Sequence, residues 1–375
     1  MHNVPLREPR RILVVLGTRP EAIKLAPVIN ALRESSSAPE VIVAATGQHR
    51  ELVRPVLDFF RIVPDINLDI MRPNQSPAGV VQRTLEQLEP VLDNTSVDLM
   101  LVQGDTSSAA AGALAGFYRK IPVGHVEAGL RTGNLYDPFP EEMNRRLIST
   151  LATYHFAPTE VNRQNLIREG VPDEQIFVTG NTVIDALHSI VNQSEATALP
   201  EQWQAPQNTK RLLLTTHRRE NFGEPQQRIF RAVNHLLANH EELSVLFPVH
   251  PNPNVQAAVQ DHLHTHSRLQ LIEPLDYITF VRLMKTSWLI LTDSGGIQEE
   301  APALGTPALV LRETTERSEA LATANTRLVG TDTDQIIAAV EHLLAHPEEY
   351  ATMARQSYPF GEPGAAERIC RILQR

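Results

Sequence analysis

The chain has 375 residues, of which 42% are hydrophobic, 21% are charged and 5% are aromatic. This composition excludes a disordered chain, because its apolar content is high enough to offset the entropy lost on folding. Asp and Glu outnumber Lys and Arg by 44 to 34, and the net charge of −10 argues against a nucleic acid or an anionic membrane as partner. An anionic ligand would therefore have to meet a local cluster of Arg and Lys.

Two further features bear on the cellular compartment. The single cysteine, Cys370, excludes an intramolecular disulfide framework and any multi-cysteine metal site. No apolar run approaches the ~18 residues that a membrane span requires. The first apolar run, at residues 12–16, is too short for the core of a signal peptide and predicts a buried strand instead. We therefore expect a reduced, cytoplasmic protein.

The first half of the chain alternates between short β-branched runs and helical patterns. Continuous apolar strands that are separated by helices form parallel sheets covered on both faces. With right-handed crossovers, this alternation predicts a doubly wound, Rossmann-like α/β domain. The predicted strands span residues 12–16, 40–45, 98–102, 122–126 and 176–178, and the predicted helices span residues 22–32, 51–59, 79–92, 108–118, 142–151 and 160–169.

The second half repeats this architecture after a change in composition. Ser, Gln, Ala, Thr and Pro dominate residues 185–207, which we assign to a linker between an N-terminal domain, residues 1–184, and a C-terminal domain, residues 208–357. A C-terminal helix within residues 358–375 is expected to pack back on the N-terminal domain. Two sheets of this kind would hold a ligand in a cleft between the carboxyl ends of their strands. The strands predicted for the second domain span residues 211–215, 244–248, 269–272, 288–291 and 307–311.

Polar residues gather in the loops after the predicted strands of the first domain. Arg19 and Lys24 follow the first strand near a helix start, where they would either meet an anion or be solvated. Asp105 follows a later strand and is either a helix N-cap or a functional acid. Glu127 lies between apolar residues at a strand end, which favours a functional carboxylate over a structural ion pair with Arg131.

Similar loops hold further candidates, each with a simpler alternative. Glu141 opens a helix, where an acid is favoured by the helix dipole whether or not it has a function. His217 and Arg218 follow the first strand of the second domain and make a cationic spot suited to a diphosphate, although a solvated basic turn is the alternative. His250 stands in a rigid loop between a strand end and two prolines.

The most specific local pattern in the second domain is a strand, then Ser294–Gly296, then a helix. Such a turn presents backbone N–H groups and a helix N-terminus to a phosphate. Glu300, one turn into that helix, would accept hydrogen bonds from ribose hydroxyls. The alternating histidines of residues 261–266 are better explained by a solvated helix end than by a metal site.

Taken together, these loop motifs resemble one family, the non-hydrolysing UDP-N-acetylglucosamine 2-epimerases. The motifs occur in that family's order over residues 17–317, and they are jointly specific. They read GTRPEAIK, GQHRE, QGDTSS, HVEAGLRTG, FPEEMNRR, THRRENFG, HPNPNV and TDSGGIQEEAPALGTPALVLRETTER.

The resemblance implies a fold, an activity and a set of partners. The fold is the glycosyltransferase-B architecture, with two Rossmann-like domains and the active site in the cleft. The activity is the reversible interconversion of UDP-GlcNAc and UDP-ManNAc without a cofactor or metal, in a homodimer that serves cell-surface polysaccharide biosynthesis. In this family UDP is eliminated to leave an enzyme-bound 2-acetamidoglucal, and UDP adds back after C2 is reprotonated on the other face.

The resemblance also assigns roles to residues. The family's catalytic acids and histidine match Asp105, Glu127, Glu141 and His217, and the face of C2 that each acid serves stays open. Candidate activator-site residues are Gln48 and Gln75, although Glu51 and Asn74 depart from the pattern of members that bind a second UDP-GlcNAc. The implied UDP-binding residues are Arg19, Lys24, Arg145, Arg218, His250, Ser294, Gly295, Gly296, Glu300 and Arg317.

Three other functions stay open on the sequence. A hydrolysing 2-epimerase would share the phosphate loops but release UDP and free ManNAc. A UDP-sugar glycosyltransferase of the same fold would not need all three acids and would need a separate acceptor. A non-catalytic UDP-sugar sensor would bind the nucleotide without exchanging the hydrogen at C2.

Overall fold

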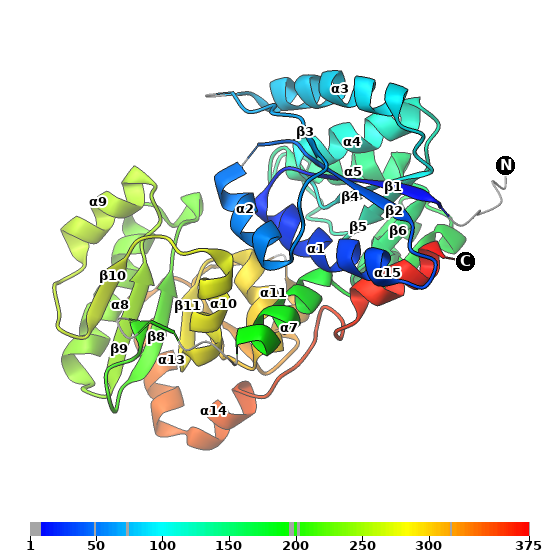
Figure 1. The fold of residues 1–375 in the computed structure, drawn as a ribbon. Helices are drawn as coiled ribbons and strands as arrows, with labels where there is room; N and C mark the ends of the chain where they lie inside the picture. Colours follow the sequence, from blue (N-terminus) through cyan, green and yellow to red (C-terminus); the bar gives the residue numbers. More distant parts are fainter. Residues whose placement is uncertain are drawn as a thin grey trace. The chain divides into compact units, whose positions relative to one another are not determined.

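The computed structural model describes residues 9–48, 50–72, 75–194, 199–200, 203–315 and 317–374. The chain divides into two compact units, which we call unit 1, Met1–Ala186 with Gly361–Arg375, and unit 2, Leu187–Phe360. Each unit has its own parallel sheet with helices on both faces (Figure 1). In the part of the chain that the structure describes, no helix is long and apolar enough to cross a membrane.

Unit 1 is built on a seven-stranded sheet in the order β3-β2-β1-β4-β5-β6-β7, and every strand pair is parallel. The order reverses between β1 and β4, so the loops that follow these strands flank the usual ligand crevice of such sheets. The strands are β1 (Arg11–Leu16), β2 (Glu40–Ala45), β3 (Ile66–Asn67), β4 (Leu99–Gln103), β5 (Val123–Val126), β6 (Tyr154–Ala157) and β7 (Ile176–Val178).

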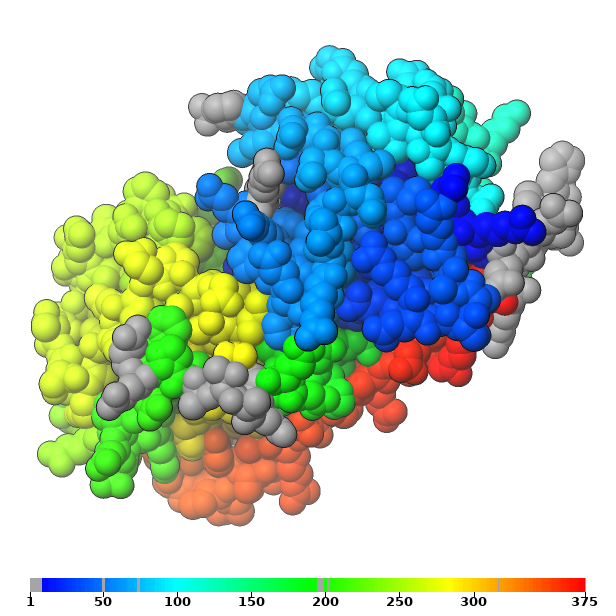
Figure 2. All heavy atoms as spheres, in the orientation of Figure 1, coloured from blue at the N-terminus to red at the C-terminus, as the bar shows by residue number. Residues whose placement is uncertain are grey.

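Helices cover both faces of this sheet, whose central strands are largely apolar and buried. From Ile12 to Leu16 every residue of β1 is buried. Helices α1, α2 and α15 pack together, as do α3, α4 and α5, and α1 to α3 form much of the surface of unit 1 in Figure 2. The helices are α1 (Arg19–Glu34), α2 (Arg50–Phe59), α3 (Pro77–Asn94), α4 (Ser107–Tyr118), α5 (Glu141–Leu151), α6 (Glu160–Arg168), η1 (Asp173–Gln175), α7 (Thr182–Ser194) and α15 (Ala365–Leu373).

Unit 2 has a six-stranded parallel sheet in the order β10-β9-β8-β11-β12-β13, which reverses between β8 and β11. Its strands are β8 (Lys210–Thr215), β9 (Leu243–Pro248), β10 (Leu269–Ile272), β11 (Leu289–Thr292), β12 (Ala308–Val310) and β13 (Thr326–Leu328). Its helices are η3 (Arg219–Asn221), α8 (Glu224–Asn239), α9 (Pro253–His262), α10 (Tyr277–Thr286), α11 (Gly295–Leu304), α12 (Ser318–Leu321), α13 (Thr333–Ala345) and α14 (Pro347–Met353).

The predicted fold class, two Rossmann-like parallel α/β units, is confirmed. Several local features differ from the sequence expectations, among them the short strands β3 and β13, which were not predicted. Residues 185–194, assigned to a linker, belong to α7, because Leu187 and Ile190 are buried at helical spacing. Strand β6 was not predicted, since His155 interrupts its apolar run. The α15 helix contacts α1 within unit 1, and Asp185 accepts backbone hydrogen bonds from the chain that leads into it.

Candidate active site

Two acids of unit 1 stand at the carboxyl ends of adjacent strands. Asp105 lies two residues beyond β4, and Glu127 comes directly after β5. Gly104 and Glu127 have φ values of 71° and 67°, the left-handed region that a residue with a side chain rarely adopts. The chain therefore turns sharply at both strand ends, and an acid there in a strained conformation is typical of functional sites.

Lys24 and Gln103 both contact the Glu127 carboxylate in unit 1. The Lys24 ammonium lies 2.6 Å from Oε1 of Glu127, and the two side chains are 12% and 10% exposed. The Gln103 amide donates a hydrogen bond to the other carboxylate oxygen. Lys24, for which the resemblance implies a role in UDP binding, thus pairs with one of the candidate catalytic acids. A lysine this close favours the charged carboxylate.

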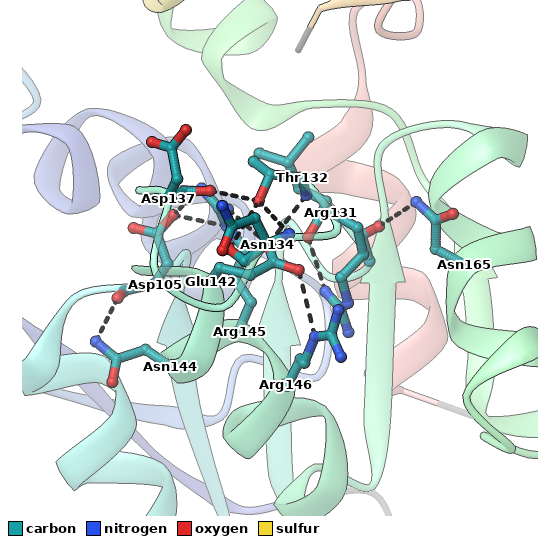
Figure 3. Close-up of polar contacts among 12 residues, drawn as sticks. Asp105, Arg131, Thr132, Asn134, Asp137, Glu142, Asn144, Arg145, Arg146 and Asn165 are labelled. Carbon is teal, nitrogen blue, oxygen red and sulfur yellow. Dashed lines mark hydrogen bonds and ion pairs between the residues drawn. The ribbon is translucent and has the colours of Figure 1, made fainter. Parts of the chain in front are cut away.

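Asp105 is bound by the first turns of α5. The Arg145 guanidinium donates from Nε and Nη2 to Oδ2 of Asp105, at 2.9 and 2.7 Å (Figure 3). The Asn144 amide donates to the backbone carbonyl of Asp105 at 2.8 Å. Among the described residues, no group donates to Oδ1 of Asp105. Arg145 therefore fixes the position of Asp105 and leaves one carboxylate oxygen available.

Glu141 has a different environment from the other two acids. It is the first residue of α5, the helix that supplies Asn144 and Arg145 to Asp105. Its Oε2 atom is buried and has no hydrogen-bond partner among the residues that the structure describes. A buried oxygen without a partner is costly, so a ligand group is a natural complement for it.

The loop after β1 is tied to the loop after β4 by Glu21, which sequence reasoning missed. The Glu21 carboxylate accepts hydrogen bonds from the backbone of Gly17 and Thr18 and from Oγ1 of Thr106, next to Asp105. Burial raises the pKa of Glu21, and these hydrogen bonds act against the rise. Arg19, at the start of α1, has no hydrogen bond or ion pair among the described residues, so its guanidinium is available to an anion.

In unit 2 a buried carboxylate organises the loop after β8. Asp293, which has no solvent exposure, accepts hydrogen bonds from the backbone N–H groups of His217 and Arg218. The side chains of Thr216 and Asn221 donate to the same carboxylate. Nδ1 of His217 lies 3.3 Å from Oδ1 of Asp293. Asp293 therefore positions the candidate catalytic histidine, a role that the sequence analysis did not assign.

Two arginines of unit 2 lie close to the start of α11. Ser294 is the N-cap, and the first backbone N–H groups of a helix lack intrahelical acceptors. A Cβ atom at Gly295 would lie 3.1 Å from Cζ of Arg317 and 3.2 Å from Nη2 of Arg218. Both guanidiniums thus come close to the bare backbone of Gly295. Arg317 also pairs with Glu299 at 3.1 Å, which orients it. This arrangement suits a phosphate or diphosphate.

The structure also shows the surroundings of three further predicted site residues, His250, Glu300 and Gly296. The exposed His250 ring stacks on His217 with centroids 5.5 Å apart. Glu300 is mostly buried and accepts a hydrogen bond from the Tyr277 hydroxyl at 3.0 Å. Gly296 follows in the first turn of α11 and is exposed.

The two candidate activator-site residues both belong to unit 1. Gln48 follows β2 and accepts a hydrogen bond from Ser108. Gln75 precedes α3 and accepts one from Arg83. Asn74 lies outside the described residues, so activator binding stays a prediction.

In the described part of the chain, no group of three His, Cys, Asp or Glu side chains is placed to hold a metal ion.

Comparisons with known proteins point to one family. A family model described as UDP-N-acetylglucosamine 2-epimerase matches residues 30–374. The UDP-N-acetylglucosamine 2-epimerase of Salmonella typhimurium is 50% identical over 370 residues, which cover 97% of this chain and 98% of that protein. The corresponding protein of Bacillus subtilis is 45% identical over 365 residues, or 97% and 94% of the two chains.

Solved structures show the same likeness. A crystal structure of UDP-GlcNAc 2-epimerase from Neisseria meningitidis bound to UDP-GlcNAc matches with a TM-score of 0.89 and 47% identity, over 97% of this chain and 99% of that one. One from Methanocaldococcus jannaschii in complex with UDP-GlcNAc and UDP matches with a TM-score of 0.79 and 34% identity, over 97% and 99% of the two chains.

Proposed function

Because the chain belongs to the UDP-N-acetylglucosamine 2-epimerase family, we propose that it interconverts UDP-GlcNAc and UDP-ManNAc by inverting C2. The observation that carries the proposal is the set of three carboxylates, Asp105, Glu127 and Glu141, at the strand ends and helix start of unit 1. Nucleotide binding alone would not need three acids with separate surroundings. The relatives solved with UDP-GlcNAc or UDP bound support this substrate.

The chemistry explains why acids and cations are both required. The C2 hydrogen of the sugar has no adjacent carbonyl to acidify it, so its removal must be coupled to departure of the leaving group at C1. A base takes the C2 proton, the C2–H electron pair forms the C1=C2 double bond, and UDP leaves with the C1–O pair. A proton then adds to C2 from the opposite face, and a diphosphate oxygen of UDP re-forms the bond at C1.

Unit 1 supplies the proton-transfer groups in this proposal. Asp105 has one oxygen fixed by Arg145 and the other available, as a base or acid at C2 requires. Glu141 has a buried oxygen without a partner among the described residues, and it serves the opposite face. Glu127, charged beside Lys24, is the third acid of the relay. Two separate acids account for inversion, because protons must be handled on both faces.

Unit 2 holds the nucleotide diphosphate. The first turn of α11, with Arg218 and Arg317 near Gly295, offers backbone donors and two guanidiniums to the departing charge. His217, positioned by Asp293, assists the leaving diphosphate. UDP therefore stays bound after elimination, and we propose the non-hydrolysing reaction, in which UDP returns to C1.

Product analysis separates this function from its competitors. UDP-GlcNAc is incubated with the enzyme, and the anomeric proton signals are followed by NMR. The proposal predicts a mixture of UDP-GlcNAc and UDP-ManNAc without accumulation of free sugar. Release of UDP together with ManNAc would identify a hydrolysing enzyme instead. Unchanged UDP-GlcNAc would leave a glycosyltransferase, tested by adding acceptors, or a sensor.

A further inference from the structure

Glu142, the neighbour of Glu141, is the most deeply buried acid of α5, with no exposed side-chain surface. Its carboxylate faces Arg145 Nη1 at 3.1 Å and Arg146 Nε at 3.3 Å (Figure 3). It also accepts a hydrogen bond from the backbone N–H of Thr132, in the loop after β5, at 3.1 Å. Glu142 thus joins α5 to that loop, and its negative charge is paired with the positive charges of Arg145 and Arg146.

Arg145 lies between this carboxylate and Asp105. Its Nε and Nη2 atoms bind Asp105, while Nη1 binds Glu142, and the arginine side chain is only 7% exposed. A guanidinium is a rigid, planar fork of donors, so a fixed acceptor on one side determines where the other side points. The orientation of Arg145, and with it the place of Asp105, therefore depends on Glu142.

We infer that Glu142 is a positioning residue, which acts through Arg145 to hold Asp105 for proton transfer at C2. The inference rests on the proposed function. Without the negative charge of Glu142, the positive charge of Arg145 attracts Asp105 more strongly. The Arg145–Asp105 ion pair then tightens, and proton transfer by Asp105 becomes slower. The other charged groups near Glu142 are Arg146, Glu169 and Arg131; Glu169 pairs with both arginines.

The test is the pair of variants Glu142→Gln and Glu169→Gln. The first neutralises the carboxylate that contacts Arg145, and the second neutralises a carboxylate of the same ion-pair network that pairs with Arg131 and Arg146 instead. Steady-state epimerisation is measured in both directions, with C2-protiated and C2-deuterated UDP-GlcNAc and UDP-ManNAc. The concentration of folded enzyme is determined from the number of UDP-binding sites, which is measured by titration calorimetry.

For Glu142→Gln we expect kcat to fall about 10- to 100-fold, with KM changed by less than about threefold. The isotope effect on kcat should rise in at least one direction, because proton transfer becomes slower than the other steps. Glu169→Gln should stay within about twofold of the wild type. A purely structural role would lower the amount of folded enzyme but would leave kcat per UDP site and the isotope effects unchanged.

A second variant keeps the test decisive if Glu142→Gln does not fold. Glu142→Asp keeps the charge but shortens the side chain by one methylene, and it should give a smaller loss of kcat with the same rise in isotope effect. Wild-type kcat and isotope effects in whichever variant folds would overturn the inference. Absence of epimerisation in the wild type would instead overturn the proposed function, so the two failures are distinguishable.

Discussion

The Nδ1 atom of His217 lies 3.3 Å from Oδ1 of Asp293, a carboxylate with no solvent exposure. The same carboxylate accepts the backbone N–H groups of His217 and Arg218, so one group fixes both the loop and the ring. An acceptor beside Nδ1 favours a proton on that nitrogen and thereby sets the orientation and tautomer of the imidazole. The position of the histidine that we assign to the leaving diphosphate thus depends on a residue that does not contact substrate in our proposal.

Replacing Asp293 with Asn should impair catalysis through His217. The amide turns one acceptor oxygen into a donor that faces N–H groups, which we expect to cost about 1–3 kcal/mol of stability. Turnover should fall about tenfold or more, and the imidazole ¹⁵N signals of His217 should move away from the pattern of an Nδ1-protonated ring. The control is Asp276→Asn, an exposed N-cap of α10 whose replacement preserves capping. Unchanged ¹⁵N signals in Asp293→Asn would contradict the assignment.

The role of the start of α11 in diphosphate binding can be tested by replacing two adjacent glycines. In Gly295→Ala the new methyl group would lie 3.1–3.2 Å from the Arg317 and Arg218 guanidiniums, so both must shift. We expect UDP to bind about tenfold more weakly, a loss of ~1.4 kcal/mol, measured by calorimetry. In Gly296→Ala the nearest side-chain atom is 4.0 Å away, so neither guanidinium has to shift and the affinity should fall less. Equal UDP affinities in the two variants would show that Arg218, Arg317 and the Gly295 backbone do not hold the diphosphate.

Removing the cation beside Glu127 should affect chemistry more than nucleotide binding. Lys24→Met leaves a nearly buried carboxylate without the ammonium at 2.6 Å, and such a group is expected to take up a proton. We therefore expect kcat to fall at least about tenfold, while calorimetry gives a UDP affinity within about threefold of the wild type. A large loss of UDP affinity with little change in kcat would assign Lys24 to the diphosphate instead.

The buried His125 should make unit 1 sensitive to acid. Its Nε2 atom lies 2.7 Å from the Gly104 carbonyl, and burial lowers the pKa of His125 to about 3. Between pH 6.5 and about 3 the unfolded chain binds a proton at this residue that the folded chain does not, so stability falls as the pH falls. His125→Gln can keep a donor near that carbonyl but cannot take up the proton.

The measurement is urea unfolding followed by circular dichroism at pH 4.5, 5.5 and 6.5. Over this range the free energy of unfolding of the wild type should decrease more steeply than that of His125→Gln, by up to about 1.4 kcal/mol per pH unit. Parallel pH dependences would mean that His125 is already protonated in the folded protein, or that it is not the group responsible.

The main features of the fold and the location of the candidate residues were accessible from sequence. Asp105 and Glu127 end neighbouring parallel strands, and the carboxyl ends of such strands meet at one edge of the sheet. The side-chain contacts at that edge of the sheet could not be predicted from the sequence. Arg145 binds Asp105 from 40 positions further along the chain, and nothing local to either residue predicts that contact.

The two adjacent acids of α5 illustrate the same limit. Glu141 and Glu142 have the same local signal, an acid in the first helical turn. The spacing of Glu142 to Arg145 and Arg146 fits helical ion pairs and could have pointed to it. Glu142, however, is completely buried and accepts a hydrogen bond from the Thr132 backbone, whereas Glu141 has a buried oxygen with no partner among the described residues. Tertiary contacts, rather than helical position, separate the roles of these two acids.

We propose that this chain removes the hydrogen at C2 of a UDP-linked sugar and returns a hydrogen to C2 on either face. It is tested most directly by incubating UDP-GlcNAc with the wild-type enzyme and with Glu141→Gln in deuterium oxide, and following the products by NMR. We expect the wild type to give UDP-GlcNAc and UDP-ManNAc that both carry deuterium at C2, while Glu141→Gln binds UDP but loses the exchange. Recovery of unlabelled UDP-GlcNAc from the wild-type reaction would contradict it.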